Sequence, residues 1–169
     1  DVPLGAIEVA AARIQGWLAH TPILTSRTAA RMVGEGQGVR LGGAGIPGRA
    51  DESPAPAAEA ARIFLKAEHL QVTGSFKPRG AVNRVLQMTP EERQRGIISM
   101  SAGNHAGAVA YAAAAAGIAV TVVMPAAASR AKAEAARGYG ATVELYGADV
   151  GETYQRMQQL LAERGSVFV

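Results

Sequence analysis

Short apolar runs alternate with helix-like runs through the second half of this chain. We expect strands at residues 97–100, 119–124, 142–145 and 166–169, and the longer helices at 78–88, 104–116, 129–137 and 150–163. Alternation of this kind is typical of β-α-β units, whose right-handed crossovers place helices on the faces of a parallel sheet. The sequence therefore predicts an α/β fold with a parallel sheet and helices on both faces.

The chain before this alternation is less regular. Residues 4–19 place apolar side chains at spacings of three and four, which predicts an amphipathic helix. An extended piece is expected at 21–25, followed by a helix over 27–33 capped by Ser26. Residues 34–60 are rich in glycine and proline and poor in large apolar side chains, which predicts a flexible insertion. A strand is then expected at 63–68.

Composition excludes several kinds of partner and site. The net charge is +3 and the basic residues are scattered, which argues against nucleic acid and membrane partners. No cysteine is present, so thiolate metal sites and cysteine nucleophiles are excluded. His20, His69 and His105 do not have the spacing of metal ligands. We therefore expect a cytoplasmic protein without a bound metal.

Lys77 lies between the strand-like run at 63–68 and a helix-like run at 81–88. Pro78 suits the first turn of a helix, because its fixed φ fits there and its missing N–H is not needed. A lysine at such a turn is most often an ordinary solvated side chain. The sharper interpretation is a reactive amine, because an amine desolvated beside Phe76 and near positive backbone dipoles loses its proton more readily and can form a Schiff base.

A second strand-to-helix junction lies at residues 101–105. Gly103 allows a ligand to approach the backbone closely, and the free N–H groups of a helix start favour an anion. The simpler interpretation is that Ser101 and Asn104 only cap the helix that follows. Ligands bind beyond the carboxyl ends of parallel strands. Because both junctions fall there, we expect Lys77 and this second motif to converge.

Two segments resemble motifs of one enzyme class. Residues 65–81 (LKAEHLQVTGSFKPRGA) resemble the lysine motif of the pyridoxal-phosphate enzymes of the tryptophan-synthase-β structural class, or fold type II, and residues 101–106 (SAGNHA) resemble their substrate and cofactor loop. The likeness is greatest to the threonine dehydratase and serine racemase branch. It implies pyridoxal phosphate as cofactor and a small amino acid as substrate. It also implies that residues 1–169 are the amino-terminal part of a dehydratase-like catalytic domain, whose carboxyl-terminal half is absent.

The resemblance further implies roles for single residues. Lys77 matches the lysine that holds the cofactor covalently and moves protons at the substrate's α-carbon. Phe76 matches an aromatic residue that packs on the cofactor ring, and Asn104 matches an asparagine that hydrogen-bonds the ring's 3′-oxygen. These donors would orient the substrate so that its α-proton points toward Lys77. Donors to the substrate carboxylate would come from Ser101, Ala102, Asn104 and His105.

Ala102 separates the two activities of this branch. Racemases typically have a second serine at this position, which acts as the acid or base on the opposite face of the substrate, and the methyl group of alanine cannot carry a proton. The resemblance therefore implies β-elimination from L-threonine, L-serine or both, with a 2-oxo acid and ammonia as products. The alternatives are an amino-acid racemase and a catalytically silent domain that binds amino acids or another chain. A homo-oligomer is left open.

Overall fold

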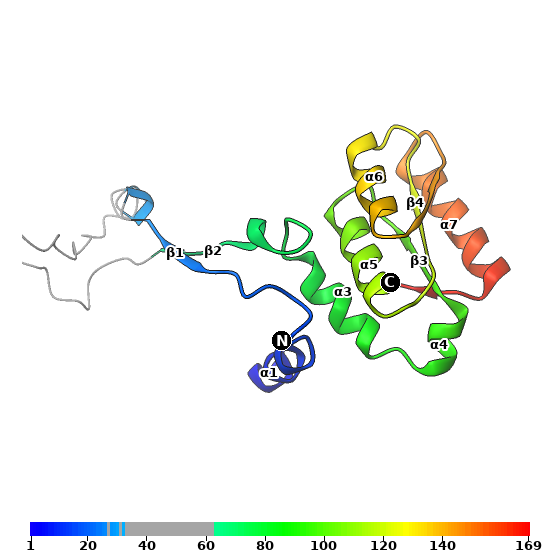
Figure 1. Ribbon diagram of the computed structural model, residues 1–169. Helices are drawn as coiled ribbons and strands as arrows, with labels where there is room; N and C mark the ends of the chain where they lie inside the picture. Colours follow the sequence, from blue (N-terminus) through cyan, green and yellow to red (C-terminus); the bar gives the residue numbers. More distant parts are fainter. Residues whose placement is uncertain (27, 31, 33–62) are drawn as a thin grey trace, which may run out of the picture. The chain divides into compact units, whose positions relative to one another are not determined.

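Figure 1 shows the computed structural model of the chain, which describes residues 1–26, 28–30, 32 and 63–169. The chain divides into a larger unit, Asp1–His20 with Glu68–Val169, and a smaller unit, Thr21–Ala67. The insertion predicted at 34–60 lies outside the described residues, as do residues 27, 31 and 33 of the predicted helix. Ser26 Oγ accepts a hydrogen bond from the backbone N–H of Ala29 at 3.1 Å, which is the predicted cap.

A four-stranded parallel sheet forms the centre of the larger unit. Its strands are β3 (Ile97–Met100), β4 (Val120–Met124), β5 (Thr142–Leu145) and β6 (Val167–Phe168), in the spatial order β5-β4-β3-β6. Every neighbouring pair is parallel, which confirms the predicted sheet. All of β4 is buried, and burial on both faces explains why its sequence is apolar almost without interruption.

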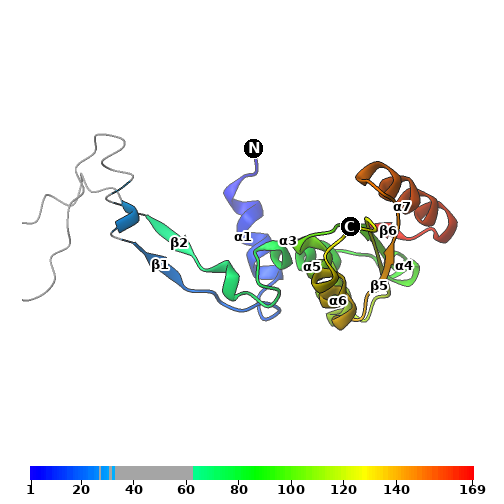
Figure 2. The same cartoon turned by 90° about the horizontal axis from the view of Figure 1, so that it is seen from above.

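Helices cover both faces of this sheet, as predicted (Figure 2). On one face, α3 (Lys77–Leu86), α5 (Asn104–Ala115) and α6 (Arg130–Gly138) contribute to the larger apolar cluster. On the other, α7 (Val150–Arg164) buries Met157 and Leu160 against Ile98 and Val123. Six residues of α5 are buried, and all but Val109 are alanine. Such short side chains allow α5 to pack closely between α3 and the strands.

The short helix α4 (Pro90–Arg95) begins at the predicted threonine cap. Thr89 Oγ1 accepts a hydrogen bond from the backbone N–H of Glu92 at 3.2 Å, and the carboxylate of Glu92 accepts one from the backbone N–H of Thr89 at 2.9 Å. This reciprocal pair is a capping box, which satisfies two N–H groups at the helix start. It joins α3 to β3 by polar contacts alone.

The first helix is shorter than the sequence predicts. α1 (Leu4–Arg13) stops well before residue 19, because Gly16 adopts a φ of +83° and turns the chain. After the turn, the carbonyl of Trp17 accepts a hydrogen bond from the Tyr111 hydroxyl at 2.6 Å. The side chains of Ile14, Trp17 and Leu18 then pack against the larger cluster. None of the described helices is both long and apolar enough to cross a lipid bilayer.

The smaller unit contains an antiparallel pair of strands, β1 (Ile23–Thr25) and β2 (Phe64–Lys66). The prediction that the strand before Lys77 belongs to the parallel sheet is therefore wrong. The strand pairs instead with β1, and the 3-10 helix η1 (Glu68–Leu70) follows before the lysine turn. The ammonium of Lys66 donates a hydrogen bond to the carbonyl of Thr21 within this unit.

Candidate active site

Lys77 is the first residue of α3, and Pro78 follows it in the first turn, as the sequence predicts. Phe76 occupies the N-cap position without a side-chain cap hydrogen bond. The hydroxyl of Ser75 accepts a weak hydrogen bond from the backbone N–H of Lys77, at 3.4 Å. The lysine thus stands at the start of a helix whose next residue, Pro78, is buried and fixes the backbone.

The side chain of Lys77 is exposed, and so is that of Phe76, at 59%. The predicted desolvation of the amine is therefore wrong for the described residues, although the Lys77 Nζ lies 5.2 Å from the centre of the Phe76 ring. The sequence has three lysines, Lys66, Lys77 and Lys132. Lys66 and Lys132 each donate a hydrogen bond, whereas no described residue accepts one from the Lys77 ammonium or forms an ion pair with it.

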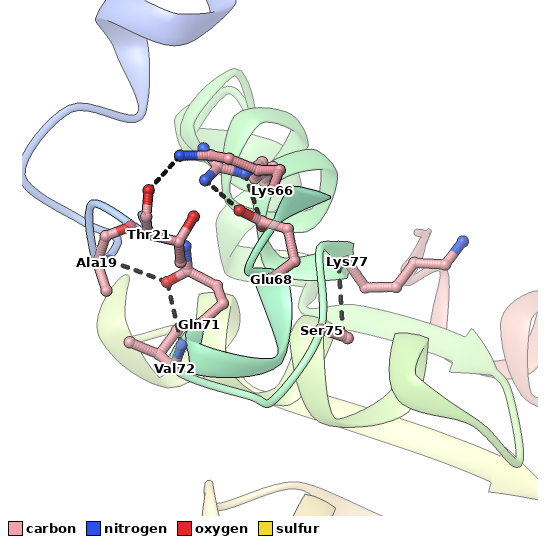
Figure 3. Close-up of polar contacts among 9 residues, drawn as sticks. Ala19, Thr21, Lys66, Glu68, Gln71, Val72, Ser75 and Lys77 are labelled. Atoms are coloured by element: carbon pink, nitrogen blue, oxygen red, sulfur yellow. Dashed lines mark hydrogen bonds and ion pairs between the residues drawn. The ribbon is translucent and has the colours of Figure 1, made fainter. Parts of the chain in front are cut away.

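Polar contacts hold the segment that carries Lys77, residues 68–79 (Figure 3). The buried side chain of Gln71 accepts hydrogen bonds from the backbone N–H groups of Ala19, at 2.9 Å, and Val72, at 3.0 Å. Its amide group donates to the carbonyl of Ala19 at 2.8 Å. In the same figure, the Lys77 side chain points away from Gln71, which leaves its amine accessible.

The guanidinium of Arg79 closes the same segment. It donates two hydrogen bonds to the carboxylate of Glu68, at 2.8 and 2.7 Å. The hydrogen bond to Glu68 raises the pKa of Arg79 above its ordinary value. This two-point contact fixes direction as well as distance, and it ties η1 to the first turn of α3.

The second motif forms the start of α5. Gly103 occupies the N-cap position with an extended backbone, and no side chain caps the helix. Ser101 Oγ accepts instead from the backbone N–H of Gly103, at 3.1 Å, so the alternative that Ser101 or Asn104 caps this helix is wrong. The first N–H groups of α5 lack partners within the helix and carry its positive dipole. They are available to an anionic group.

A pocket of about 180 Å³ brings the two motifs together. Its hydrogen bonds run from the Lys132 ammonium to Asn104 Oδ1 at 3.3 Å, and from the Tyr139 hydroxyl to the carbonyl of Val72 at 2.9 Å. The Thr73 hydroxyl is buried without a hydrogen-bond partner among the described residues. The pocket is lined by Val72, Thr73, Gly103, Asn104, Gly107, Lys132, Ala135 and Tyr139.

Asn104 alone among the predicted site residues lines this pocket. The predicted convergence thus occurs between residues 72–73 and the start of α5. Sequence reasoning missed Lys132 and Tyr139, which approach from α6 and the turn after it and have no motif of their own. Among the described residues, no three histidine, aspartate or glutamate side chains gather where they could hold a metal. The predicted residues outside the pocket lining are Phe76, Lys77, Ser101, Ala102 and His105.

The family model for "Pyridoxal-phosphate dependent enzyme" matches residues 50–169, well over half of the chain. The chain belongs to the pyridoxal-phosphate dependent enzyme family. This confirms the predicted family and, with it, the cofactor of that family. Among curated relatives, the chain is 38% identical over 168 residues to L-threonine dehydratase catabolic TdcB of Staphylococcus aureus (strain USA300). The match takes in 99% of this chain and 41% of that protein.

Solved structures of pyridoxal-phosphate dependent enzymes have the same fold. Maize serine racemase superposes with a TM-score of 0.75 at 28% identity, covering 98% of this chain and 43% of that one. A threonine deaminase from the organism abbreviated T.th. superposes with a TM-score of 0.72 at 33% identity, covering 99% of this chain and 44% of that one. The predicted fold type II class is therefore confirmed, and the chain spans less than half the length of these relatives.

The groups of this pyridoxal-phosphate enzyme chain suit its family cofactor. Lys77 offers an amine without a described hydrogen-bond partner, which a covalent attachment requires. The buried hydroxyl of Thr73 and the side-chain amide of Asn104 offer donors at the pocket. The uncapped start of α5 adds N–H groups for a negative charge. Donors and an amine are the chemistry that an anionic aldehyde needs.

Proposed function

We propose that this chain supplies the amino-terminal part of an ammonia-lyase that converts L-threonine, L-serine or both to a 2-oxo acid and ammonia. Relatives named for threonine dehydratase or deaminase, at 38% and 33% identity, support this assignment. The observation that carries it is the Lys77 amine at the start of α3, without a described polar partner. The activity itself is proposed for the full-length enzyme, because the chain spans 41% of the first of these relatives.

Lys77 would act first as the covalent anchor of the cofactor and then as a base at the substrate's α-carbon. When bound, pyridoxal phosphate supplies an electron sink for that carbon. The Lys77 amine would take the α-proton, and the β-hydroxyl would leave with a proton as water. The enamine that results takes up water and releases ammonia, so that the atoms balance without an oxidant or reductant.

The second motif would bind and orient the amino acid. Backbone and side-chain donors at Ser101, Ala102 and His105 would receive the substrate carboxylate, where the uncapped start of α5 favours a negative charge. Asn104 would donate from its side-chain amide to the cofactor ring and help to hold the carboxylate. Phe76, which is exposed in this chain, would pack on the cofactor ring.

An amino-acid racemase is the second candidate, and the similarity to maize serine racemase favours it. A racemase needs a proton carrier on each face of the α-carbon. Ala102 offers only a methyl group at the position where we expect the second carrier. Elimination, which needs one proton-moving face, therefore fits these residues better. The cytoplasm and a homo-oligomeric assembly stay predictions that no described residue tests.

The first experiment asks which lysine reacts with the cofactor. The purified chain is mixed with pyridoxal phosphate, its visible absorbance is recorded before and after addition of L-threonine, and the linkage is reduced with borohydride. Three lysines make the result easy to assign by peptide mass. We expect the label on Lys77, an absorbance band that Lys77→Ala abolishes, and a band that Lys66→Arg preserves because arginine can still donate to the Thr21 carbonyl.

The outcomes separate the candidates. A band that shifts with L-threonine, followed by ammonia release, supports the dehydratase. Interconversion of L- and D-serine would favour the racemase, and saturable threonine binding without ammonia release would favour a silent binding domain. Label distributed evenly over Lys66, Lys77 and Lys132 would contradict the assignment of Lys77.

A further inference from the structure

We propose that Lys132 is a positioning residue, which orients the side-chain amide of Asn104. Lys132 lies in the first turn of α6, and Asn104 is the first residue of α5. The two helices pack against each other in the larger cluster, and the Lys132 Nζ lies 3.3 Å from Asn104 Oδ1. Both side chains line the pocket that joins the two motifs. This inference deepens the proposed function and rests on it.

The chemistry of the two groups decides how the amide must lie. An ammonium has three donors and no acceptor, whereas the asparagine amide has an acceptor oxygen at one end and a donor nitrogen at the other. Lys132 can therefore bond only to Oδ1, and this contact excludes the flipped amide. Nδ2 is then turned away from Lys132. No described residue accepts a hydrogen bond from it, so it is left to donate to a ligand.

Lys132 is free of competing ion pairs in the part of the chain that the structure describes. The nearest carboxylate along α6, that of Glu134, forms an ion pair with Arg137 at 2.9 Å. The opposite wall of the pocket is held by Tyr139, whose hydroxyl donates to the Val72 carbonyl. The Tyr139 ring also meets that of Tyr111 edge to face, with 5.7 Å between ring centres. Lys132 thus contacts Asn104 across a pocket with a fixed far wall.

The orientation matters because a ring oxygen of the cofactor needs a donor. If Asn104 were flipped, its Oδ1 would face that oxygen, and two acceptors would repel each other. Lys132 would therefore raise the population of the productive orientation without touching the cofactor. Its own role is positioning, while the contact belongs to Asn104.

The first test needs no cofactor. The side-chain amide signals of Asn104 are recorded by ¹⁵N–¹H NMR in the wild-type chain and assigned from their absence in Asn104→Ala. We expect Lys132→Met to move both amide proton signals, and Arg130→Met to leave them in place. Arg130→Met is the matched control, because it removes a positive charge from the same exposed helix start without a described contact to Asn104. Unchanged Asn104 signals in Lys132→Met would overturn the proposal.

The second test is a double-mutant cycle on the affinity for pyridoxal phosphate. Loss of one hydrogen bond predicts about three- to tenfold weaker binding for Lys132→Met, with most of the affinity retained in Lys132→Arg. In the Asn104→Ala background, Lys132→Met should have no further effect, because its route of action is gone. An equal loss in both backgrounds would mean that Lys132 acts on the cofactor directly, which contradicts positioning. A wild-type chain without a Lys77-dependent band would count against the proposed function, while the NMR result would still decide the contact.

Discussion

Different forces hold the start of α5 and the segment that carries Lys77. α5 stands on apolar packing, with its alanine face and Val109 buried beside a strand, β4, that is buried throughout. Residues 68–79 expose their large apolar side chains, Leu70, Val72 and Phe76. That segment is held instead by the amide of Gln71 and the guanidinium of Arg79.

The difference has a consequence for how each motif fails. Apolar packing is non-directional and involves many contacts, so damage to it lowers the stability of the whole sheet. A few directional hydrogen bonds hold the lysine segment, so the loss of one of them opens that segment while the sheet stays folded. The two halves of the proposed site should therefore be separable by mutation.

The largest effect is expected from Ile97→Ala, in the core beneath α5. Ile97 is 2% exposed and belongs to the larger apolar cluster. Removing its side chain should lower the free energy of unfolding by about 2–5 kcal/mol, through lost burial and the cavity that remains. Urea unfolding measures this change. The matched control is Leu145→Ala on β5, which is 45% exposed and should change stability by about 0.5 kcal/mol or less. Equal losses in the two variants would contradict the role given to apolar packing.

A smaller and local effect is expected from Gln71→Met. The substitution keeps the shape of a buried side chain but removes its hydrogen bonds with Ala19 and Val72. We expect the free energy for opening residues 68–76 to fall by about 1–3 kcal/mol, because backbone groups lose their partners. Amide hydrogen exchange should become faster in that segment and stay unchanged in β3 and β4. The Lys77-dependent absorbance band should weaken with it.

Gln87→Met is the matched control for this variant. The Gln87 amide also donates to a backbone carbonyl, that of Asn83 at 2.8 Å, but on an exposed helix end. It should leave exchange in residues 68–76 unaltered. If Gln71→Met accelerated exchange equally in β4, the segment and the sheet would be one cooperative unit, and the comparison would fail.

Local signals explain how much could be predicted from the sequence. The boundaries of β3 and β5 match the predicted 97–100 and 142–145, because glycines and short apolar runs mark them unambiguously. The start of α4 follows from Thr89 and Pro90, whose capping chemistry lies within one turn. The start of α3 at Lys77 follows in the same way from Pro78.

Contacts between distant residues could not be predicted in this way. The partner of β2 is β1, with Leu65 opposite Leu24, and the short apolar run alone does not tell an antiparallel neighbour from a parallel one. The same holds for Gln71, whose partner is the backbone of Ala19. The contact of Lys132 with Asn104 likewise depends on how α5 and α6 pack, which leaves no periodic pattern in either helix.

The smallest effect is expected from acid at the junction of α3 and α4. The carboxylate of Glu92 accepts hydrogen bonds from the Arg84 guanidinium, at 3.0 Å, and from the backbone N–H of Thr89. These contacts, with Arg84 the larger contributor, lower the pKa of Glu92. A carboxyl group whose pKa is lower in the folded state than in the unfolded state adds stability above the unfolded value, about 4.3 for glutamate. That contribution is lost as the pH falls through the lower, folded value.

Glu92→Gln should therefore shift the urea midpoint most at neutral pH, and the gap to the wild-type chain should shrink as the pH drops below about 4.3. Ile97→Ala provides the contrast, because the effect of an apolar side chain does not titrate, and its gap to the wild-type chain should stay constant over the same range. If the two gaps vary in parallel with pH, a general acid effect on the sheet dominates. If only the Glu92→Gln gap closes, a charge-dependent contact stabilises the α3–α4 junction, whereas apolar burial stabilises the sheet at every pH tested.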